Sequence, residues 1–138
     1  MKAFGCHPSA TDSRDRLFRD LEVGPGEPSR GDLIGNFPMR INDQRSTSSC
    51  VGQSLSTGIR LAHIVQHSRD PGILSARWAY RAALAVAGAE MVDMGCQPRH
   101  AIKAAQKGGI ATEAAWPWDP RAPLAHPGLL AARSARPL

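Results

Sequence analysis

A cysteine preceded by short polar residues carries the clearest chemical signal in this sequence. Ser48 and Ser49 precede Cys50 and are good N-cap residues, and an apolar stripe follows it. We therefore expect Cys50 to begin a helix. There the macrodipole and the free backbone N–H groups favour the thiolate over the thiol, which makes Cys50 a candidate nucleophile.

Gln44 lies six residues before Cys50, in a stretch of short polar residues. A loop of that length can fold the Gln44 side-chain amide back beside the sulfur. The amide and the backbone N–H of Cys50 would then donate hydrogen bonds to one oxyanion. Such an arrangement suits acyl transfer from an amide, provided that a base lies nearby.

Each of these residue types also has a structural interpretation. Cysteine is among the most buried residue types, so a lone cysteine more often packs in a core than reacts. Three pairs could contribute to a metal site, but none has a full ligand set, so we expect neither a metal nor another cofactor. These pairs are His63 with His67, Cys96 with His100, and Cys6 with His7.

The periodic apolar pattern predicts three helices. The first runs from about Cys50 to Gln66 and the second from about Ser75 to Ala87. The third begins near Pro98 and ends at Gly108-Gly109. The residues expected on their apolar faces are Leu55, Ile59 and Ala62; Trp78, Ala82 and Ala85, with Leu84 beside them; and Ile102 and Ala105.

The chain divides into three parts by composition. Residues 1–36 are polar and rich in Gly and Pro, with a breaker at Gly24–Pro28 and one amphipathic turn at Arg16–Leu21. Residues 37–119 carry the periodic pattern and form the folded part. Residues 120–138 contain several prolines and no clear period, so we expect an irregular tail.

Composition narrows the class of protein. The formal net charge is +5, but the arginines are scattered and aromatics make up only 5% of the residues, so nucleic acid is an unlikely partner. No apolar run is long enough for a membrane span or a signal peptide, so we expect a cytoplasmic chain. Its three cysteines, an odd number, agree with a reducing compartment.

Four blocks of sequence, between about residues 36 and 120, resemble the papain family of cysteine peptidases, especially its bacterial and viral members. The family motif Gln-Gly-Ser-x-Gly-Ser-Cys has the same spacing between Gln and Cys as Gln44 and Cys50. In order, the blocks are Asp43–Ser54, Leu74–Arg81, Asp93–Cys96 with Ala101–Ala105, and Gly109–Asp119.

The resemblance implies an α+β fold in which this chain is the mostly helical N-terminal lobe, with the cysteine on a long central helix. The β-rich second lobe would be missing. The resemblance also implies that Cys50 is the nucleophile and Gln44 the oxyanion donor. Ser49 and Pro98 would then contact substrate in the cleft.

Several positions depart from the family pattern. Arg45 and Ser48 stand where the active-site loop usually has glycines, and Val51 replaces an aromatic residue. Thr47 occupies the place of a disulfide cysteine in secreted members. The partner of that cysteine corresponds to Cys96, which we therefore expect to be a free thiol.

The sequence contains no good candidate for the catalytic histidine. In the family, the histidine and the asparagine that orients it come well over a hundred residues after the nucleophile. His126 follows Trp118 too closely to match, and His63 would lie about 20 Å along the helix from Cys50. We expect a truncated or incomplete peptidase with little activity alone, unless a second lobe or chain supplies the His and Asn.

Two other classes of function remain open at this level. A degenerate peptidase lobe could bind a peptide or protein partner without cutting it. A small basic interaction protein is the third hypothesis, and it predicts that Gln44 and Cys50 are spatially unrelated.

Overall fold

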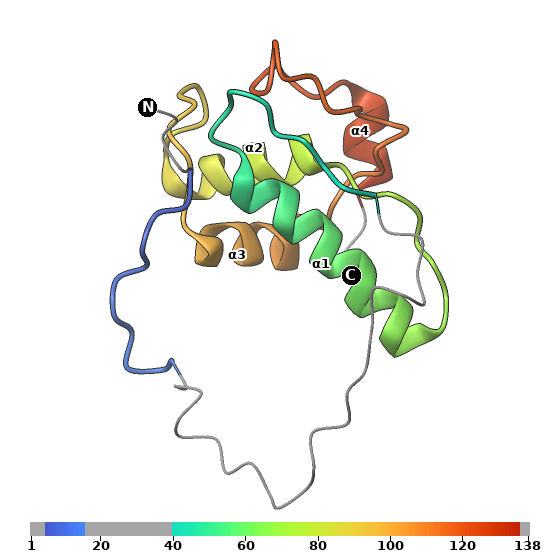
Figure 1. Ribbon diagram of the computed structural model, residues 1–138, viewed down its shortest axis with the longest axis horizontal. Helices are drawn as coiled ribbons and strands as arrows, with labels where there is room; N and C mark the ends of the chain where they lie inside the picture. The colour runs from blue at the N-terminus through green and yellow to red at the C-terminus, as the bar shows by residue number, and fades with distance from the viewer. Residues whose placement is uncertain (1–4, 16–39, 136–138) are drawn as a thin grey trace, which may run out of the picture. The chain divides into compact units, whose positions relative to one another are not determined.

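The computed structural model describes residues 5–15 and 40–135. Four helices follow one another along the chain: α1 (Cys50–His67), α2 (Ala76–Ala87), α3 (Pro98–Gly108) and α4 (Leu129–Ser134). Within the described residues, β-structure is limited to two isolated bridges, Cys6 with Cys96 and Leu74 with Thr112. The three helices that the sequence predicts are therefore confirmed (Figure 1).

The chain forms two compact units, one made of residues 1–9 and 44–138 and the other of residues 10–43. In the smaller unit, Asp12 accepts hydrogen bonds from the backbone and the guanidinium of Arg14. The breaker at Gly24–Pro28 and the turn at Arg16–Leu21 lie outside the described residues.

Helix α1 is the longest helix, with 18 residues, and it begins at Cys50 as expected. It ends where Ser68 adopts a left-handed conformation (φ 51°) and returns its N–H to the carbonyl of Ile64. Arg60, which lies within α1, donates hydrogen bonds to both carboxylate oxygens of Asp70, at 2.9 and 2.6 Å. Asp70 lies just beyond the end of the helix. This ion pair fixes the start of the connection to α2.

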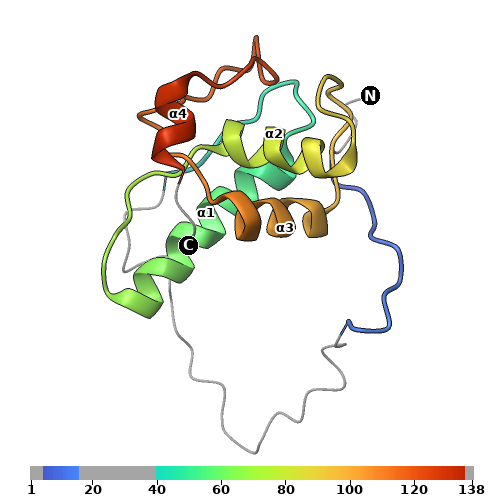
Figure 2. The same cartoon turned by 180° about the vertical axis from the view of Figure 1, so that it is seen from behind.

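Helix α2 lies against both α1 and α3, which contact each other less (Figures 1 and 2). Its N-cap is Ser75, whose hydroxyl accepts the N–H of Trp78 and donates to the carbonyl of Trp116. Close to α1, the helix packs against Gly52, which has no side chain to separate the two backbones. Buried side chains form two core clusters that both include residues of α2. One consists of Val51, Tyr80, Ala83, Leu84, Cys96 and Ala101, and the other of Leu74, Ala79, Ala105 and Ile110.

Two of the predicted apolar faces are only partly confirmed. On α2, Leu84 is fully buried and Trp78 and Ala82 are half-buried, but Ala85 is exposed. The helix also buries Tyr80, which the predicted face does not include. On α3, Ala105 is buried as expected, but the Ile102 side chain is 48% exposed. Helix α2 buries Arg77 and Arg81, which an apolar pattern assigns to solvent, so its periodicity does not identify the face that packs.

The segment after α3 is held against α2 by two buried arginines. Arg77 donates to the carbonyls of Pro117 and Ala122, and Arg81 donates to the carbonyl of Leu124 (2.5 Å). The expected irregular tail of residues 120–138 contains the short helix α4, anchored by the buried Ala131. Backbone carbonyls, rather than an apolar stripe, order this part of the chain, so the pattern of apolar residues gives no sign of it.

Candidate active site

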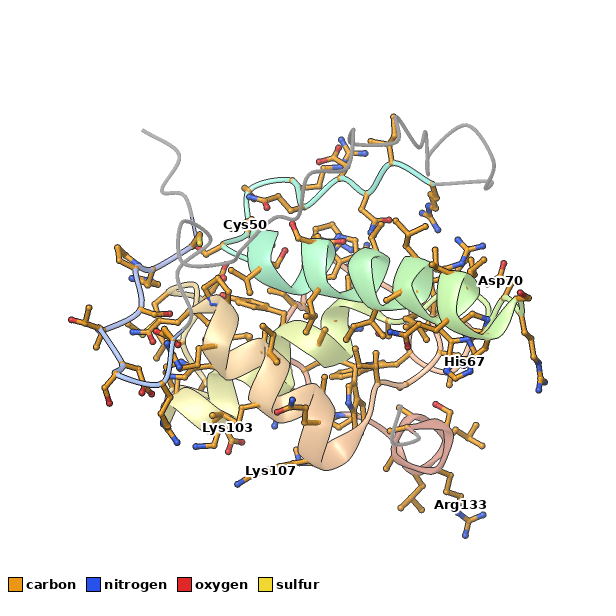
Figure 3. All side chains as sticks on the ribbon, turned by 90° about the horizontal axis from the view of Figure 1, so that it is seen from below. Cys50, His67, Asp70, Lys103, Lys107 and Arg133 are labelled. Atoms are coloured by element: carbon orange, nitrogen blue, oxygen red, sulfur yellow. The ribbon has the colours of Figure 1, made fainter. Side chains whose placement is uncertain are left out.

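Cys50 is the first residue of α1 and its side chain is half-buried. Figure 3 shows Cys50 at one end of this helix and His67 at the other. The preceding residue, Ser49, is the N-cap by position, but its hydroxyl does not bond to the helix N–H groups. The first backbone N–H groups of a helix have no partner within the helix and carry its positive partial charge. Cys50 is therefore placed at the end of α1 that carries these groups.

The loop before Cys50 folds back on itself at Gln44. The Thr47 backbone N–H and hydroxyl both donate to the Gln44 carbonyl, at 3.3 and 2.7 Å, and the Gln44 side-chain amide donates to the Thr47 carbonyl (3.1 Å). Between them Arg45 adopts a positive φ of 58°. An amide nitrogen has two N–H groups, so the contact with Thr47 uses one of them and the other suits an oxyanion. That role of Gln44 stays a prediction.

The Ser49 side chain is fully buried behind this loop. Its hydroxyl forms hydrogen bonds with the Thr47 hydroxyl (2.8 Å) and the Gln53 side chain (3.4 Å). It therefore supports the turn that leads into α1. The Ser49 backbone supports the same turn, since its carbonyl accepts the N–H of Gln53 (3.0 Å). Contact between Ser49 and a substrate stays a prediction.

A network that sequence reasoning missed connects the loop to α2. The Ser48 backbone N–H donates to Asp93 Oδ1 (3.0 Å), and the Tyr80 hydroxyl donates to the same oxygen (2.5 Å). The Tyr80 oxygen in turn accepts the N–H of Gly95 (3.1 Å). Tyr80 is completely buried, and its pKa is raised, first by burial and then by the bond to Asp93. The one signal in the sequence was a tyrosine among small helix residues, since a buried tyrosine hydroxyl needs a partner.

We expect Tyr80→Phe to destabilise the chain by about 2 kcal/mol, because it leaves the buried N–H of Gly95 without an acceptor and removes one of the hydrogen bonds to Asp93. Urea unfolding followed by circular dichroism measures this loss. Asp93→Asn is the companion variant, since its amide oxygen can still accept the N–H of Ser48. A neutral effect of Tyr80→Phe would mean that the hydroxyl does not support the loop.

An open apolar pocket lies beside Cys50, between α1 and α3, with a volume of about 380 Å³. Pro98, which the resemblance places in the cleft, is exposed and lines it together with Ile102. We call it the thiol pocket, and the residues that line it are Cys6, Cys50, Val51, Ser54, Leu55, Gly58, Ile59, Ala62, Pro98 and Ile102. The exposed face of Ile102 is thus part of a groove.

A second pocket of about 310 Å³ continues the groove toward the far end of α1. It shares Leu55, Ile59, Ala62 and Ile102 with the thiol pocket, so the two form one groove between α1 and α3. Its other residues include His63 and His67, whose ring centroids are 4.6 Å apart. The apolar stripe predicted for α1 therefore lines a groove in addition to contacting the core.

No histidine is among the described residues that line the thiol pocket. His63 and His67 line only the second pocket, and His63 Nδ1 contacts the Arg69 carbonyl (3.0 Å). His126 is exposed and its Nδ1 lies 3.2 Å from the Pro127 carbonyl. In residues 5–15 and 40–135, no group of three or more His, Cys, Asp and Glu side chains could hold a metal ion.

Comparison with solved structures places this geometry in a known fold. The chain is similar to the crystal structure of xylellain, a cysteine protease from Xylella fastidiosa, with a TM-score of 0.73 and 24% sequence identity. The match covers 96% of this chain and 54% of xylellain. This chain shares the fold of about half of a cysteine protease. Its helices agree with the N-terminal lobe that the sequence resemblance implies.

Sequence comparisons find no such relative: no family model matches the chain, and no curated protein does. The likeness to xylellain is therefore one of fold. Among the helices of the described ranges, none has the length and apolar character needed to cross a membrane.

Proposed function

We propose that this chain is the cysteine-bearing half of a papain-like cysteine peptidase. The observation that carries the proposal is the position of Cys50, at the first residue of α1 and beside an open apolar pocket, in a fold shared with a cysteine protease. The substrate would be a peptide or protein, bound near Cys50 with Pro98 at the cleft.

In the proposed reaction, the Cys50 thiolate attacks the carbonyl carbon of a peptide bond. The oxyanion that forms accepts hydrogen bonds from the Cys50 backbone N–H and the Gln44 amide. Collapse of this intermediate expels the amine, which must receive a proton, and water then releases the acyl group. A histidine would hold the proton between these steps, and no described residue at the thiol pocket fills that role.

We propose that the histidine comes from a second lobe or chain that covers the groove between α1 and α3. The side chains of Leu55, Ile59 and Ile102 line this groove and offer an apolar surface next to Cys50. A partner that packs on them would exclude water from the thiol and could present a His and an Asn to it. Such a chain alone would be an incomplete enzyme.

The second candidate function is a peptidase-like module that binds a peptide or protein without cleaving it. The absence of a histidine from the described lining of the thiol pocket favours it. The two candidates differ in whether Cys50 is needed: a Cys50→Ala variant would keep the binding of a partner but lose every acyl transfer.

Alkylation of the thiols tests the proposal. In a Cys6→Ser background, we expect Cys50 to react with iodoacetamide about tenfold faster at pH 7 than free cysteine, because a helix N-terminus favours the thiolate. Cys96 should lag far behind, since it is 2% exposed and burial raises its pKa to about 12. Mass spectrometry of the peptides gives both rates. Equal, slow labelling at the two sites would contradict an activated nucleophile.

A further inference from the structure

The three cysteines of the chain gather at one end of α1. The backbones of Cys6 and Cys96 pair in an isolated parallel β-bridge, and their thiols are not bonded to each other. The side chains of Cys6 and Cys50 both line the thiol pocket. The negative charges of Cys50 and Cys6 also help to raise the pKa of Cys96, after the larger effect of burial. Cys6 is thus the backbone partner of Cys96 and lines the same pocket as Cys50, although the three residues come from distant parts of the sequence.

The segment that carries Cys6 is firmly held in this place. Cys96 donates its N–H to the Gly5 carbonyl (2.8 Å), and the backbone N–H of His7 donates to the Cys96 carbonyl (3.1 Å). The His7 ring also bonds to the Met94 carbonyl (2.6 Å). Gly5 fits closely against the loop before Cys50, since a Cβ atom on it would lie 1.8 Å from the Ser48 carbonyl oxygen. Cys6 is thus fixed beside the candidate nucleophile.

We propose that Cys6 and Cys50 form a reversible disulfide when the protein meets a peroxide, so that Cys6 acts as the resolving thiol for Cys50. Cys6 is exposed and Cys50 is half-buried, so both are open to a small oxidant. The disulfide would cap the Cys50 sulfur, and a regulatory effect on peptide cleavage rests on the proposed function.

The chemistry balances with hydrogen peroxide as the oxidant. The Cys50 thiolate attacks one peroxide oxygen, the O–O bond breaks, and Cys50 sulfenic acid and hydroxide form. The Cys6 thiolate then attacks the Cys50 sulfur, the S–O bond breaks, and a second hydroxide leaves. The two protons lost by the thiols convert both hydroxides to water. Two electrons pass from the thiols to the peroxide, and a dithiol reductant reverses the result.

Cys96 is a poor competitor in this chemistry although it is the backbone partner of Cys6. It is 2% exposed, so peroxide has little access to it. Its high pKa keeps it protonated at neutral pH, and the thiol form is a weak nucleophile. The exposed Cys6 is therefore better suited to capture the Cys50 sulfenic acid.

Trypsin makes the linkage easy to assign, because it places each cysteine on a separate peptide. These peptides are Ala3–Arg14, Ser46–Arg60 and Ala82–Arg99. The reduced full chain is treated with a small excess of hydrogen peroxide at low protein concentration, blocked with N-ethylmaleimide and digested without reductant. We expect a disulfide-linked pair of the first two peptides, and a loss of two of the three thiols in titration under denaturing conditions.

Two variants provide the controls. Cys96→Ser should still form the linkage, whereas Cys6→Ser should lose it and leave a Cys50 sulfenic acid that dimedone traps. A linkage of Cys6 to Cys96, a dimer joined through Cys50, or over-oxidised Cys50 in the unaltered chain would each overturn the proposal. The mapping requires no peptidase activity, so a failed activity assay and a failed linkage are separate outcomes.

Discussion

Replacing Gly52 with alanine should destabilise the chain by about 3 kcal/mol, since overpacking where backbones meet forces elements apart. A Cβ atom at this position would lie 2.8 Å from both the Ala76 carbonyl oxygen and the Tyr80 nitrogen, and 2.6 Å from the Tyr80 Cβ. Two of these three atoms belong to the backbone of α2, so no rotation of a side chain relieves the contact. Helices α1 and α2 would have to separate.

Gly58 offers the matched control, because it lies in the same helix with nothing within 4 Å of an added Cβ. Gly58→Ala should stabilise the chain by about 0.5–1 kcal/mol through helix propensity alone. Urea unfolding followed by circular dichroism compares the two variants. If both substitutions stabilised the chain, the close approach of α1 and α2 at Gly52 would be disproved.

The second large effect concerns catalysis. We expect the purified chain to cleave a fluorogenic peptide no faster than its Cys50→Ala variant. A positioned general base contributes roughly 10²–10⁴-fold to such a reaction, and the described lining of the thiol pocket provides none. Addition of a second polypeptide that supplies a His and an Asn should raise the rate by at least that factor. The rate with and without Cys50 is the direct measurement.

Clear turnover by the chain alone, lost in Cys50→Ala, would show that a base lies within it. His7 and His126 would then be replaced by alanine one at a time. His7 directly follows Cys6, but successive side chains of an extended segment point to opposite sides, and Cys6 is the one that lines the thiol pocket. His126 belongs to the segment that precedes α4. A base at either position would contradict the need for a partner.

Helices α1, α2 and α3 could be predicted because each has a local start or stop signal. A serine precedes α1 and α2, and a proline is the first residue of α3. Gly88 and Gly109 follow the last residues of α2 and α3, and both have a positive φ. These signals depend on only a few neighbouring residues, so they can be recognised in the sequence without knowledge of the tertiary packing.

The packing faces could not be predicted in the same way. The buried side of α2 includes Arg77 and Arg81, whose charges are compensated by carbonyls some forty residues later in the chain. A prediction from the hydrophobic pattern places arginine in solvent, so it assigns part of the wrong face of α2 to the core. Ile102 misleads in the opposite sense, since it lines an open groove instead of a core.

At the candidate site, the position of Cys50 follows from local sequence, but its surroundings do not. Asp93 and Gly5 contact the loop at Ser48 only in the folded chain. Both are distant from Ser48 in the sequence, and no sequence pattern predicts either contact. The resemblance to a peptidase family gave Gln44 a possible role, whereas the gathering of Cys6 beside Cys50 has no local signature.

The bridge between Cys6 and Cys96 has a consequence for the order of events during synthesis. The segment that carries Cys6 leaves the ribosome before α1 and α2, yet its pairing partner follows only after both of these helices. Until Cys96 emerges, the Gly5 carbonyl lacks its hydrogen-bond donor, the Cys96 N–H, and this bond cannot hold Gly5 in its position beside Ser48. Cys6 and Cys50 therefore stay outside their final arrangement during most of translation. The pairing of the Cys6 segment with Cys96 is a late step that depends on a contact between distant parts of the sequence.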